Sequence, residues 1–115
     1  MTPSVLIVVP DLFFATRIRE VAASIGATVV EAAGPDAVAT ARARDVTLAI
    51  VDLAGGPAAA ATVAALRAAS PSMRIVGFHS HVDVAAREAA LAAGADQVLP
   101  RSAFTRRLAE LLAGD

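Results

Sequence analysis

Two aspartates stand at the ends of apolar runs, where a carboxylate can hold a metal ion or accept a chemical group. Asp11 follows residues 5–9 through Pro10, and Asp52 directly follows residues 46–51. An unbroken run rich in β-branched residues is typical of a strand buried on both faces of a parallel sheet. Ligands of such sheets bind beyond the carboxyl ends of the strands. The two carboxylates are therefore predicted to share one rim and to form an acidic site.

Other polar side chains follow two later strand-like runs: His79, Ser80 and His81, then Arg101 and Ser102. These side chains and the two aspartates also have ordinary structural explanations. An aspartate after a strand often caps the next helix or turn, and a loop histidine is more often solvated than bound to metal. Arg101 is most simply the partner of a carboxylate, and Ser102 is expected to cap the last helix.

Strand-like and helix-like segments alternate along the whole chain. Strands are predicted at residues 4–9, 27–32, 46–51, 74–78 and 97–99. Helices are predicted at residues 12–25, 34–44, 57–69, 82–93 and 103–113. The first helix is expected to bury one face, made by Phe14, Ile18, Val21, Ala22 and Ile25. Five strand–helix units with short connections predict a doubly wound α/β fold, with a parallel sheet covered by helices on both faces.

Composition narrows the class of protein. The 115 residues are enough for one domain, here residues 1–115, and 57% of them are hydrophobic. The net charge of −1 and the lack of any arginine block argue against direct contact with nucleic acid or a membrane surface. No cysteine is available for disulfides or thiolate chemistry. The apolar runs are too short to span a bilayer, and the first has no basic region before it, so a cytoplasmic domain is expected.

Taken together, four segments resemble the receiver domain of two-component response regulators, over essentially the whole chain. They are residues 8–11, 49–53, 92–96 and 98–102. The resemblance implies a flavodoxin-like (CheY-like) α/β fold, with a five-stranded parallel sheet in the order 2-1-3-4-5 and five helices. It places Asp52 where receivers accept a phosphoryl group, Asp11 in the acidic pair that holds Mg²⁺, and Arg101 at the place of a phosphoryl-binding lysine.

The sequence departs from receivers at the partners of Asp52. Pro10 replaces the second acidic residue, His79 stands where a hydroxyl is usual, and Ser80 comes one residue late. Three oxygens remain for a weak Mg²⁺ site, from Asp11, Asp52 and the Ala54 carbonyl, so the expected cofactor is none or weakly bound Mg²⁺. Arginine is always charged, so Arg101 is expected to form a standing salt bridge with Asp52. Asp11, Asp52 and Arg101 are predicted to cluster at the rim.

These departures favour a non-enzymatic, degenerate receiver that signals through protein contacts. The partner would be a histidine kinase, an output domain, another regulator or a second copy of the chain. Receivers commonly use the surface of the fourth helix, fifth strand and fifth helix, which here includes Arg87, Val98, Arg106, Arg107 and Glu110.

Two alternatives stay open. One is a conventional phospho-receiver that is modified at Asp52 and binds Mg²⁺ weakly. The other is a small α/β enzyme or ligand-binding module. No Gly-x-Gly-x-x-Gly motif follows the first strand, and the chain has no lysine for a phosphate loop, but this architecture hosts many chemistries.

Overall fold

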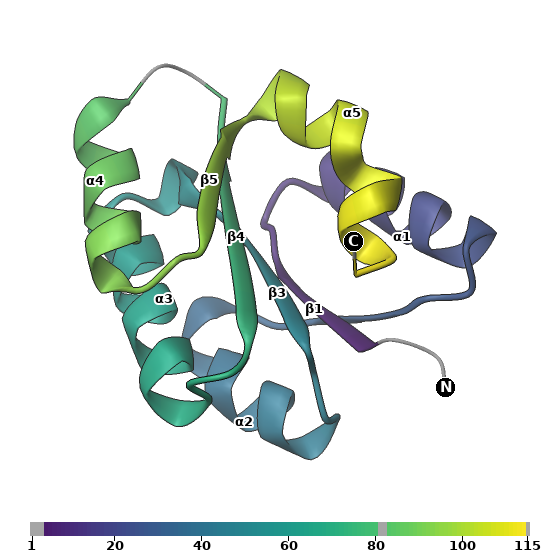
Figure 1. The fold of residues 1–115 in the computed structure, drawn as a ribbon, viewed down its shortest axis with the longest axis horizontal. Helices are drawn as coiled ribbons and strands as arrows, with labels where there is room; N and C mark the ends of the chain where they lie inside the picture. Colours follow the sequence, from purple (N-terminus) through teal and green to yellow (C-terminus); the bar gives the residue numbers. More distant parts are fainter. Residues whose placement is uncertain (1–3, 81–82, 115) are drawn as a thin grey trace.

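A five-stranded parallel sheet forms the centre of the molecule (Figure 1). The computed structural model describes residues 4–80 and 83–114. The sheet order is β2-β1-β3-β4-β5, as predicted. Its strands are β1 (Ser4–Val8), β2 (Thr28–Glu31), β3 (Leu48–Asp52), β4 (Arg74–His79) and β5 (Gln97–Pro100).

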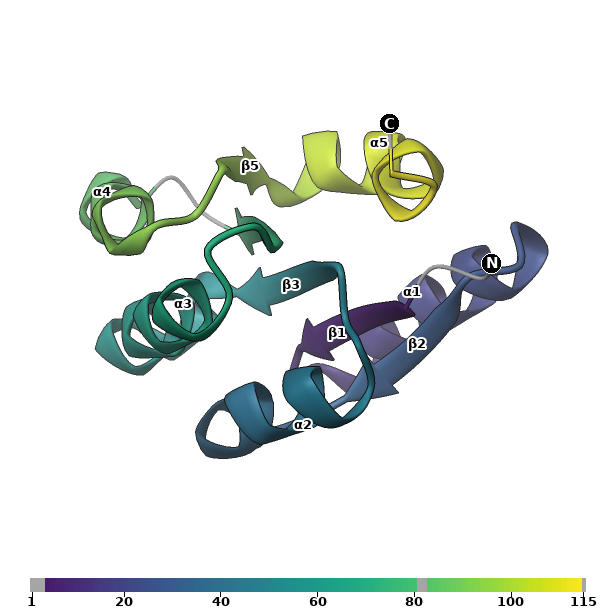
Figure 2. The same cartoon turned by 60° about the horizontal axis from the view of Figure 1, so that its bottom comes forward.

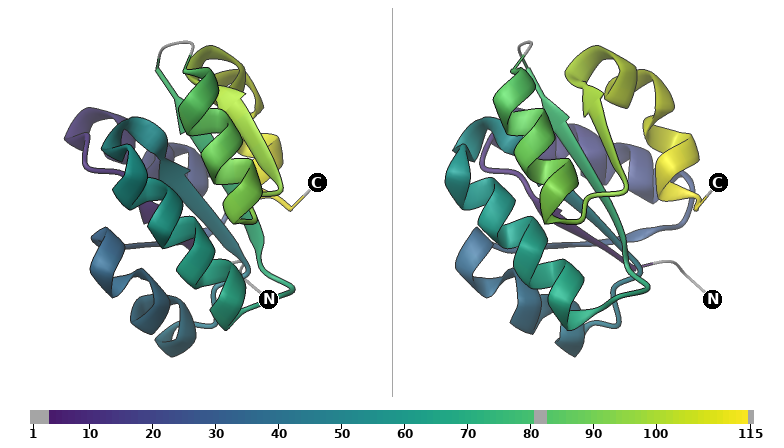
Figure 3. Two further views of the ribbon diagram at one scale, coloured as in Figure 1. Left: turned by 90° about the vertical axis from the view of Figure 1, so that its left-hand side faces the viewer. Right: turned by 60° about the vertical axis from the view of Figure 1, so that its left-hand side comes forward.

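Helices cover both faces of the sheet, so the strands are buried on both sides (Figure 2). One face carries α1 (Leu12–Ser24) and α5 (Arg101–Leu112). The other carries α2 (Ala37–Ala43), α3 (Pro57–Ala69) and α4 (Val84–Ala93), which lie side by side in Figure 3. Successive strand residues face opposite helix layers, which divides the core in two. In residues 4–80 and 83–114, no helix is both long and apolar enough to cross a membrane.

Short 3₁₀ turns replace parts of the predicted helices and loops. The turn η1 (Gly34–Asp36) precedes α2, and η2 (Leu53–Gly55) connects β3 to α3. The last helix begins at Arg101, two residues earlier than predicted. Ser102 therefore lies inside the first turn, and the expectation that it caps α5 is wrong: Pro100 holds the N-cap position without a side-chain hydrogen bond. Ile25, predicted to be buried, is exposed because it is the C-cap residue of α1.

Arg67 ties together the turns at the rim opposite the strands' carboxyl ends. Its guanidinium donates to the carbonyls of Gly94 at 3.0 Å and Met73 at 2.6 Å, and to Oδ2 of Asp96 at 2.8 Å. Gly94 ends α4 with φ of 117°, and a Cβ there would lie 2.7 Å from the Arg67 side chain. Only glycine suits both this backbone conformation and this close approach.

Candidate functional site

Asp11 leaves β1 at the carboxyl rim and caps the helix that follows. Its Oδ1 accepts hydrogen bonds from the backbone amides of Phe13 at 3.0 Å and Phe14 at 3.1 Å. This is the ordinary N-cap arrangement, in which a side-chain oxygen satisfies amides that have no helical partner. The capping role considered for a strand-end aspartate is therefore realised here, and it occupies one of the two carboxylate oxygens.

Arg101 engages the other oxygen of Asp11. Its Nη2 lies 3.0 Å from Oδ2, and the centre of the guanidinium lies 4.1 Å from the centroid of the Phe14 ring. An arginine stacked on an aromatic face is held in orientation as well as paired. The Phe14 amide and then the Arg101 guanidinium hold the pKa of the Asp11 carboxyl below its usual 3.8, although partial burial opposes them. The first turn of α5 thereby contacts the first turn of α1.

Asp52 ends β3 beside Asp11 and does not receive the expected salt bridge. The Val8–Val51 pairing in the β1–β3 register brings both aspartates to the same rim, as predicted. Asp52 Oδ1 accepts from the Ala54 amide at 2.9 Å and caps η2, whereas its Oδ2 has no hydrogen-bond partner among the described residues. The expectation that Arg101 neutralises Asp52 is therefore wrong, because the stack on Phe14 directs the guanidinium to Asp11.

His79 and Ser80 follow at the same rim. His79 ends β4 opposite Pro100 of β5, and its Nδ1 is buried with no hydrogen-bond partner in residues 4–80 and 83–114. Ser80, which comes one residue after the position where receivers have a hydroxyl, is exposed. His81 lies outside the described residues.

Comparison with known proteins gives matches only at the level of structure. No protein-family model matches the chain, and no curated protein sequence matches it. A response regulator receiver domain protein (CheY-like) from Methanospirillum hungatei JF-1 has a TM-score of 0.86 at 19% identity, covering 99% of this chain and 93% of that one. A response regulator from Thermotoga maritima has a TM-score of 0.84 at 19% identity, covering 99% and 97%.

A third structure is similar over most of its length. It is a response regulator protein from Burkholderia pseudomallei, solved with a phosphorylated aspartic acid, a calcium ion and citrate. Its TM-score is 0.78 at 22% identity, covering 97% of this chain and 72% of that one. The chain has the receiver-domain fold.

The rim of this receiver fold suits Mg²⁺ poorly. Both oxygens of Asp11 are already used, one by the α1 amides and one by Arg101. A metal ion there would have to displace the guanidinium. In residues 4–80 and 83–114, no group of three or more His, Cys, Asp or Glu side chains could hold a metal ion. The expected set of two carboxylates and the Ala54 carbonyl is smaller than such a group, so weak Mg²⁺ binding stays a prediction.

The predicted interaction face needs one correction. β5 is an edge strand, with α4 and α5 on either side of it (Figure 2). Arg87, Arg106 and Glu110 are exposed as expected, but Val98 is only 7% exposed and packs beneath α4 in the core. The Arg107 side chain is already engaged within the domain, since it pairs with Glu110 at 3.0 Å and donates to Gln97 at 3.3 Å.

Sequence reasoning missed exposed apolar residues on two helices. On α4, Val84 is 60% exposed and Leu91 is 38% exposed, and the seven-residue spacing puts them on one side of the helix with Arg87 between them. At the start of α1, Leu12 and Phe13 project from the rim, with Phe13 91% exposed. The sequence signal for these exposed residues was their position in the helical pattern, since they lie off the buried face of each helix.

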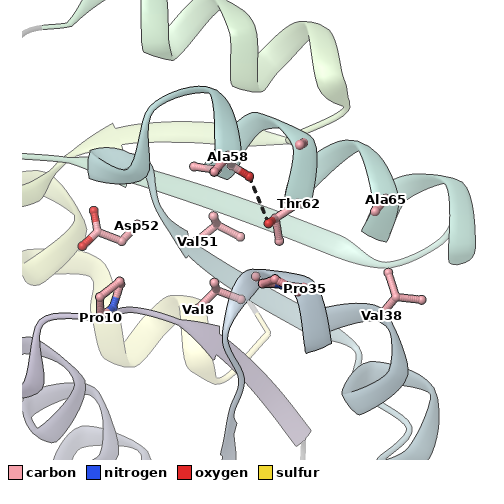
Figure 4. Close-up of a pocket in the computed structure, with 12 residues that line it drawn as sticks. Val8, Pro10, Pro35, Val38, Val51, Asp52, Ala58, Thr62 and Ala65 are labelled. Carbon is pink, nitrogen blue, oxygen red and sulfur yellow. Dashed lines mark hydrogen bonds between the residues drawn. The ribbon is translucent and has the colours of Figure 1, made fainter.

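Sequence reasoning also missed an apolar pocket on the α2–α3 side of the rim (Figure 4). Its volume is about 460 Å³. It lies between η1, α2 and α3, with Val8 of β1 and Val51 of β3 in its lining and Pro10 and Asp52 at one end. The alanine-rich composition of α3 was the only sequence signal, because small side chains leave space between helices.

Proposed function

We propose that this chain is a signalling domain of the receiver type that works in the cytoplasm through protein contacts, without a phosphoryl switch and without catalysis of its own. The ion pair between Arg101 and Asp11 carries this proposal. It occupies the two residues that correspond to a phosphoryl-binding lysine and a metal-binding acid in receivers. A phosphoryl group on Asp52 would have to compete with Asp11 for Arg101, and a metal ion would have to displace it.

Substitutions around the pair support the same conclusion. Pro10 offers no carboxylate, and His79 offers no hydroxyl at the end of β4. Phosphoryl transfer depends on metal ions and cations that neutralise the developing charge. With those partners lost or already engaged, transfer to Asp52 should be slow.

Small-molecule phosphodonors test the proposal directly. The domain is incubated with acetyl phosphate and Mg²⁺ and analysed by intact mass, with an ordinary receiver treated in parallel. We expect the control to gain a phosphoryl group and this chain to gain none. A Pro10→Asp, His79→Thr and Arg101→Lys triple variant should recover labelling at Asp52. Stoichiometric labelling of the wild type that disappears in Asp52→Asn would overturn the proposal.

That outcome would establish the alternative, a conventional phospho-receiver. One observation favours it: Oδ2 of Asp52 has no hydrogen-bond partner among the described residues, so the oxygen is available for attack on a phosphodonor. The similar Burkholderia pseudomallei response regulator was solved with a phosphorylated aspartic acid. The labelling experiment separates the two functions.

The partner surface is proposed on α4, β5 and α5. Arg87 and Arg106 have no ion-pair partner among the described residues, and they belong to α4 and α5, the helices on either side of the edge strand β5 (Figure 2). With Val84 and Leu91 they make an apolar surface that also carries charges of both signs, since Glu88 and Glu110 are exposed on the same two helices, and it is suited to a helix or strand of a signalling partner or to a second copy of the chain. Leu91→Ser should weaken self-association or partner capture, whereas Phe13→Ser on the other helix layer should not. Light scattering and cross-linking with the two variants provide the measurement.

A further inference from the structure

The apolar pocket beside Asp52 has the dimensions of a small-molecule site. Its volume of about 460 Å³ lies within the range of roughly 300–1,000 Å³ that is usual for ligand pockets. The pocket runs between two helices and ends at the carboxyl rim of the sheet, where α/β folds most often bind ligands (Figure 4). It is separate from the α4–β5–α5 surface.

Small residues create the space of the pocket, and η1 approaches α3 closely beside it. One face of α3 carries only small side chains toward the pocket. It is lined by Ala58, Ala61 and Ala65, which are spaced three and four residues apart. Across from them, Gly34 of η1 approaches so closely that a Cβ would lie 2.7 Å from Oγ1 of Thr62. The close approach of η1 to α3 therefore lies at one wall of the pocket, and α2 and α3 also share the core beneath it.

The residues that line the pocket include a negative charge and no positive charge. Asp52 is the only charged residue among the lining residues. The Thr62 hydroxyl donates to the Ala58 carbonyl at 3.1 Å, so it has only acceptor capacity left. Arg101 is engaged with Asp11, which leaves the Asp52 carboxylate without a cation among the described residues. A ligand that complements this pocket must bring both an apolar body and a positively charged donor.

The direction of Asp52 sets the shape of that ligand. Figure 4 shows its carboxylate oxygens at the end of the pocket beside Pro10, turned away from Val38 and Ala65 at the far end. An apolar body lying between α2 and α3 therefore reaches the carboxylate only with a head group at its tip. We propose that the pocket binds an elongated amphipathic amine, with its apolar part against α3 and its ammonium group at Asp52. Such binding would give the signalling domain a small-molecule input that does not depend on its proposed protein contacts.

Phenylbutylamine is a suitable probe, with phenylbutanol and phenylbutyrate as neutral and anionic counterparts of similar length. Titration calorimetry measures affinity, and alanine methyl signals in NMR spectra locate the site. We expect saturable binding of the amine with shifts in α3, weaker binding of the alcohol and none of the carboxylate. Absence of saturable amine binding, or equal affinity for all three probes, would overturn the proposal.

Matched variants test the site itself. Ala61→Leu fills the pocket, whereas Ala64→Leu adds the same side chain at an exposed α3 position outside it. Asp52→Asn removes the charge at the pocket, whereas Asp45→Asn removes one from the opposite rim. We expect Ala61→Leu to abolish binding and Asp52→Asn to weaken it by roughly fivefold, the value of one partly exposed ion pair. Unchanged affinity in both pocket variants, or equal losses in both controls, would overturn the assignment.

Discussion

At the scale of single residues, Arg101 decides the charge balance of the carboxyl rim. It pairs with Asp11 and stacks on Phe14, so one carboxylate has a cationic partner while Asp52 has none among the described residues. Asp11 also holds the start of α1 through two backbone amides. Asp11 therefore connects the first helix to the last through its two carboxylate oxygens. This favours a rim with one arrangement over a rim that switches.

The lowered pKa of Asp11 predicts how the stability of the protein depends on pH. A carboxyl group whose pKa is depressed by folding stabilises the native state above its usual pKa of 3.8, and loses that contribution as the pH falls through the lower native value. Asn is also a good N-cap, so Asp11→Asn removes mainly the charge. Wild type should therefore be more stable than Asp11→Asn at neutral pH, and the difference should vanish in acid.

Denaturant unfolding over a series of pH values measures this difference. Asp45→Asn serves as the control, because the Asp45 side chain is exposed and has no partner among the described residues. A gap between wild type and Asp11→Asn that is the same at neutral and acidic pH would contradict the role assigned to the charge of Asp11.

Removal of Arg101 tests whether Asp11 and Asp52 can bind a metal ion together. Arg101→Ala frees one oxygen of Asp11 at the rim it shares with Asp52, and the two carboxylates then have no cationic partner among the residues that the structure describes. We expect the melting temperature to fall by a few degrees and to recover partly in millimolar Mg²⁺, because an ion that binds only the native state stabilises it. Wild type should respond to Mg²⁺ less than Arg101→Ala does, and Arg106→Ala on the same helix should behave like wild type. Thermal unfolding measures all three, and equal Mg²⁺ responses would rule out the site.

At the scale of elements, two contacts between distant segments hold the α2–α3–α4 layer. Arg67 joins the end of α3 to the turns before β4 and β5, through the carbonyls of Met73 and Gly94 and the carboxylate of Asp96. At the other rim, Gly34 brings η1 against Thr62 of α3. The first contact fixes α3 relative to α4, and the second keeps α3 close to α2 on one side of the pocket.

Arg67→Ala should destabilise the protein more than the same substitution at an exposed arginine. It removes several hydrogen bonds from a charged donor and leaves carbonyls at the turns unpaired, a loss on the order of 2 kcal/mol. Arg87→Ala, on the exposed side of α4, should change the free energy of unfolding by less than about 0.5 kcal/mol. Chemical denaturation of both variants provides the comparison, and equal effects would show that the Arg67 contacts contribute little.

Gly34→Ala should disturb the contact between η1 and α3. The added methyl group would meet Thr62 Oγ1 at 2.7 Å, so one segment must move, at a cost of about 1–3 kcal/mol. Thr62→Ala removes the obstructing hydroxyl, so the double variant should lose less stability than the sum of the two single variants. A double-mutant cycle measures this coupling. Additive effects would mean that the contact is relieved by other movements.

At the scale of the whole molecule, the two ends of the chain close the same core. α1 and α5 pack on one face of the sheet, where Phe14, Phe78 and Phe104 form a ring cluster. The stacked rings of Phe78 and Phe104 have centroids 4.8 Å apart. The Asp11–Arg101 pair lies between the first turns of the same two helices. The charge pair at the rim therefore depends on how well this core is packed.

Phe104→Ala should threaten the whole fold. Truncating a fully buried phenylalanine costs about 3–5 kcal/mol, a large part of the 5–15 kcal/mol that usually stabilises a domain. Phe13→Ala is the matched control, since its side chain is 91% exposed and packs on nothing that holds the fold. Circular dichroism during thermal unfolding should give a much lower melting temperature for Phe104→Ala and an unchanged one for Phe13→Ala. Similar melting temperatures would contradict the core assignment.

The amino-acid sequence by itself determined the strands, their order through the receiver resemblance, and the rim on which Asp11 and Asp52 lie. These features depend on local patterns: apolar runs, glycine stops and the direction that parallel strands share. Helix boundaries were not determined in this way, since α5 starts at Arg101, two residues before the predicted start. Cap geometry there depends on how Pro100 leaves the sheet, not on a pattern within the helix.

Only the tertiary structure decided which carboxylate Arg101 pairs with, that Val98 is buried, and that a pocket opens between α2 and α3. Each depends on atoms from segments far apart in the sequence. The choice of Asp11 over Asp52 follows from the Phe14 ring, which α1 places under the guanidinium. The pocket follows from the distance at which Gly34 and Thr62 hold two elements. Such relationships arise from packing in three dimensions, and residue type and spacing do not encode them locally.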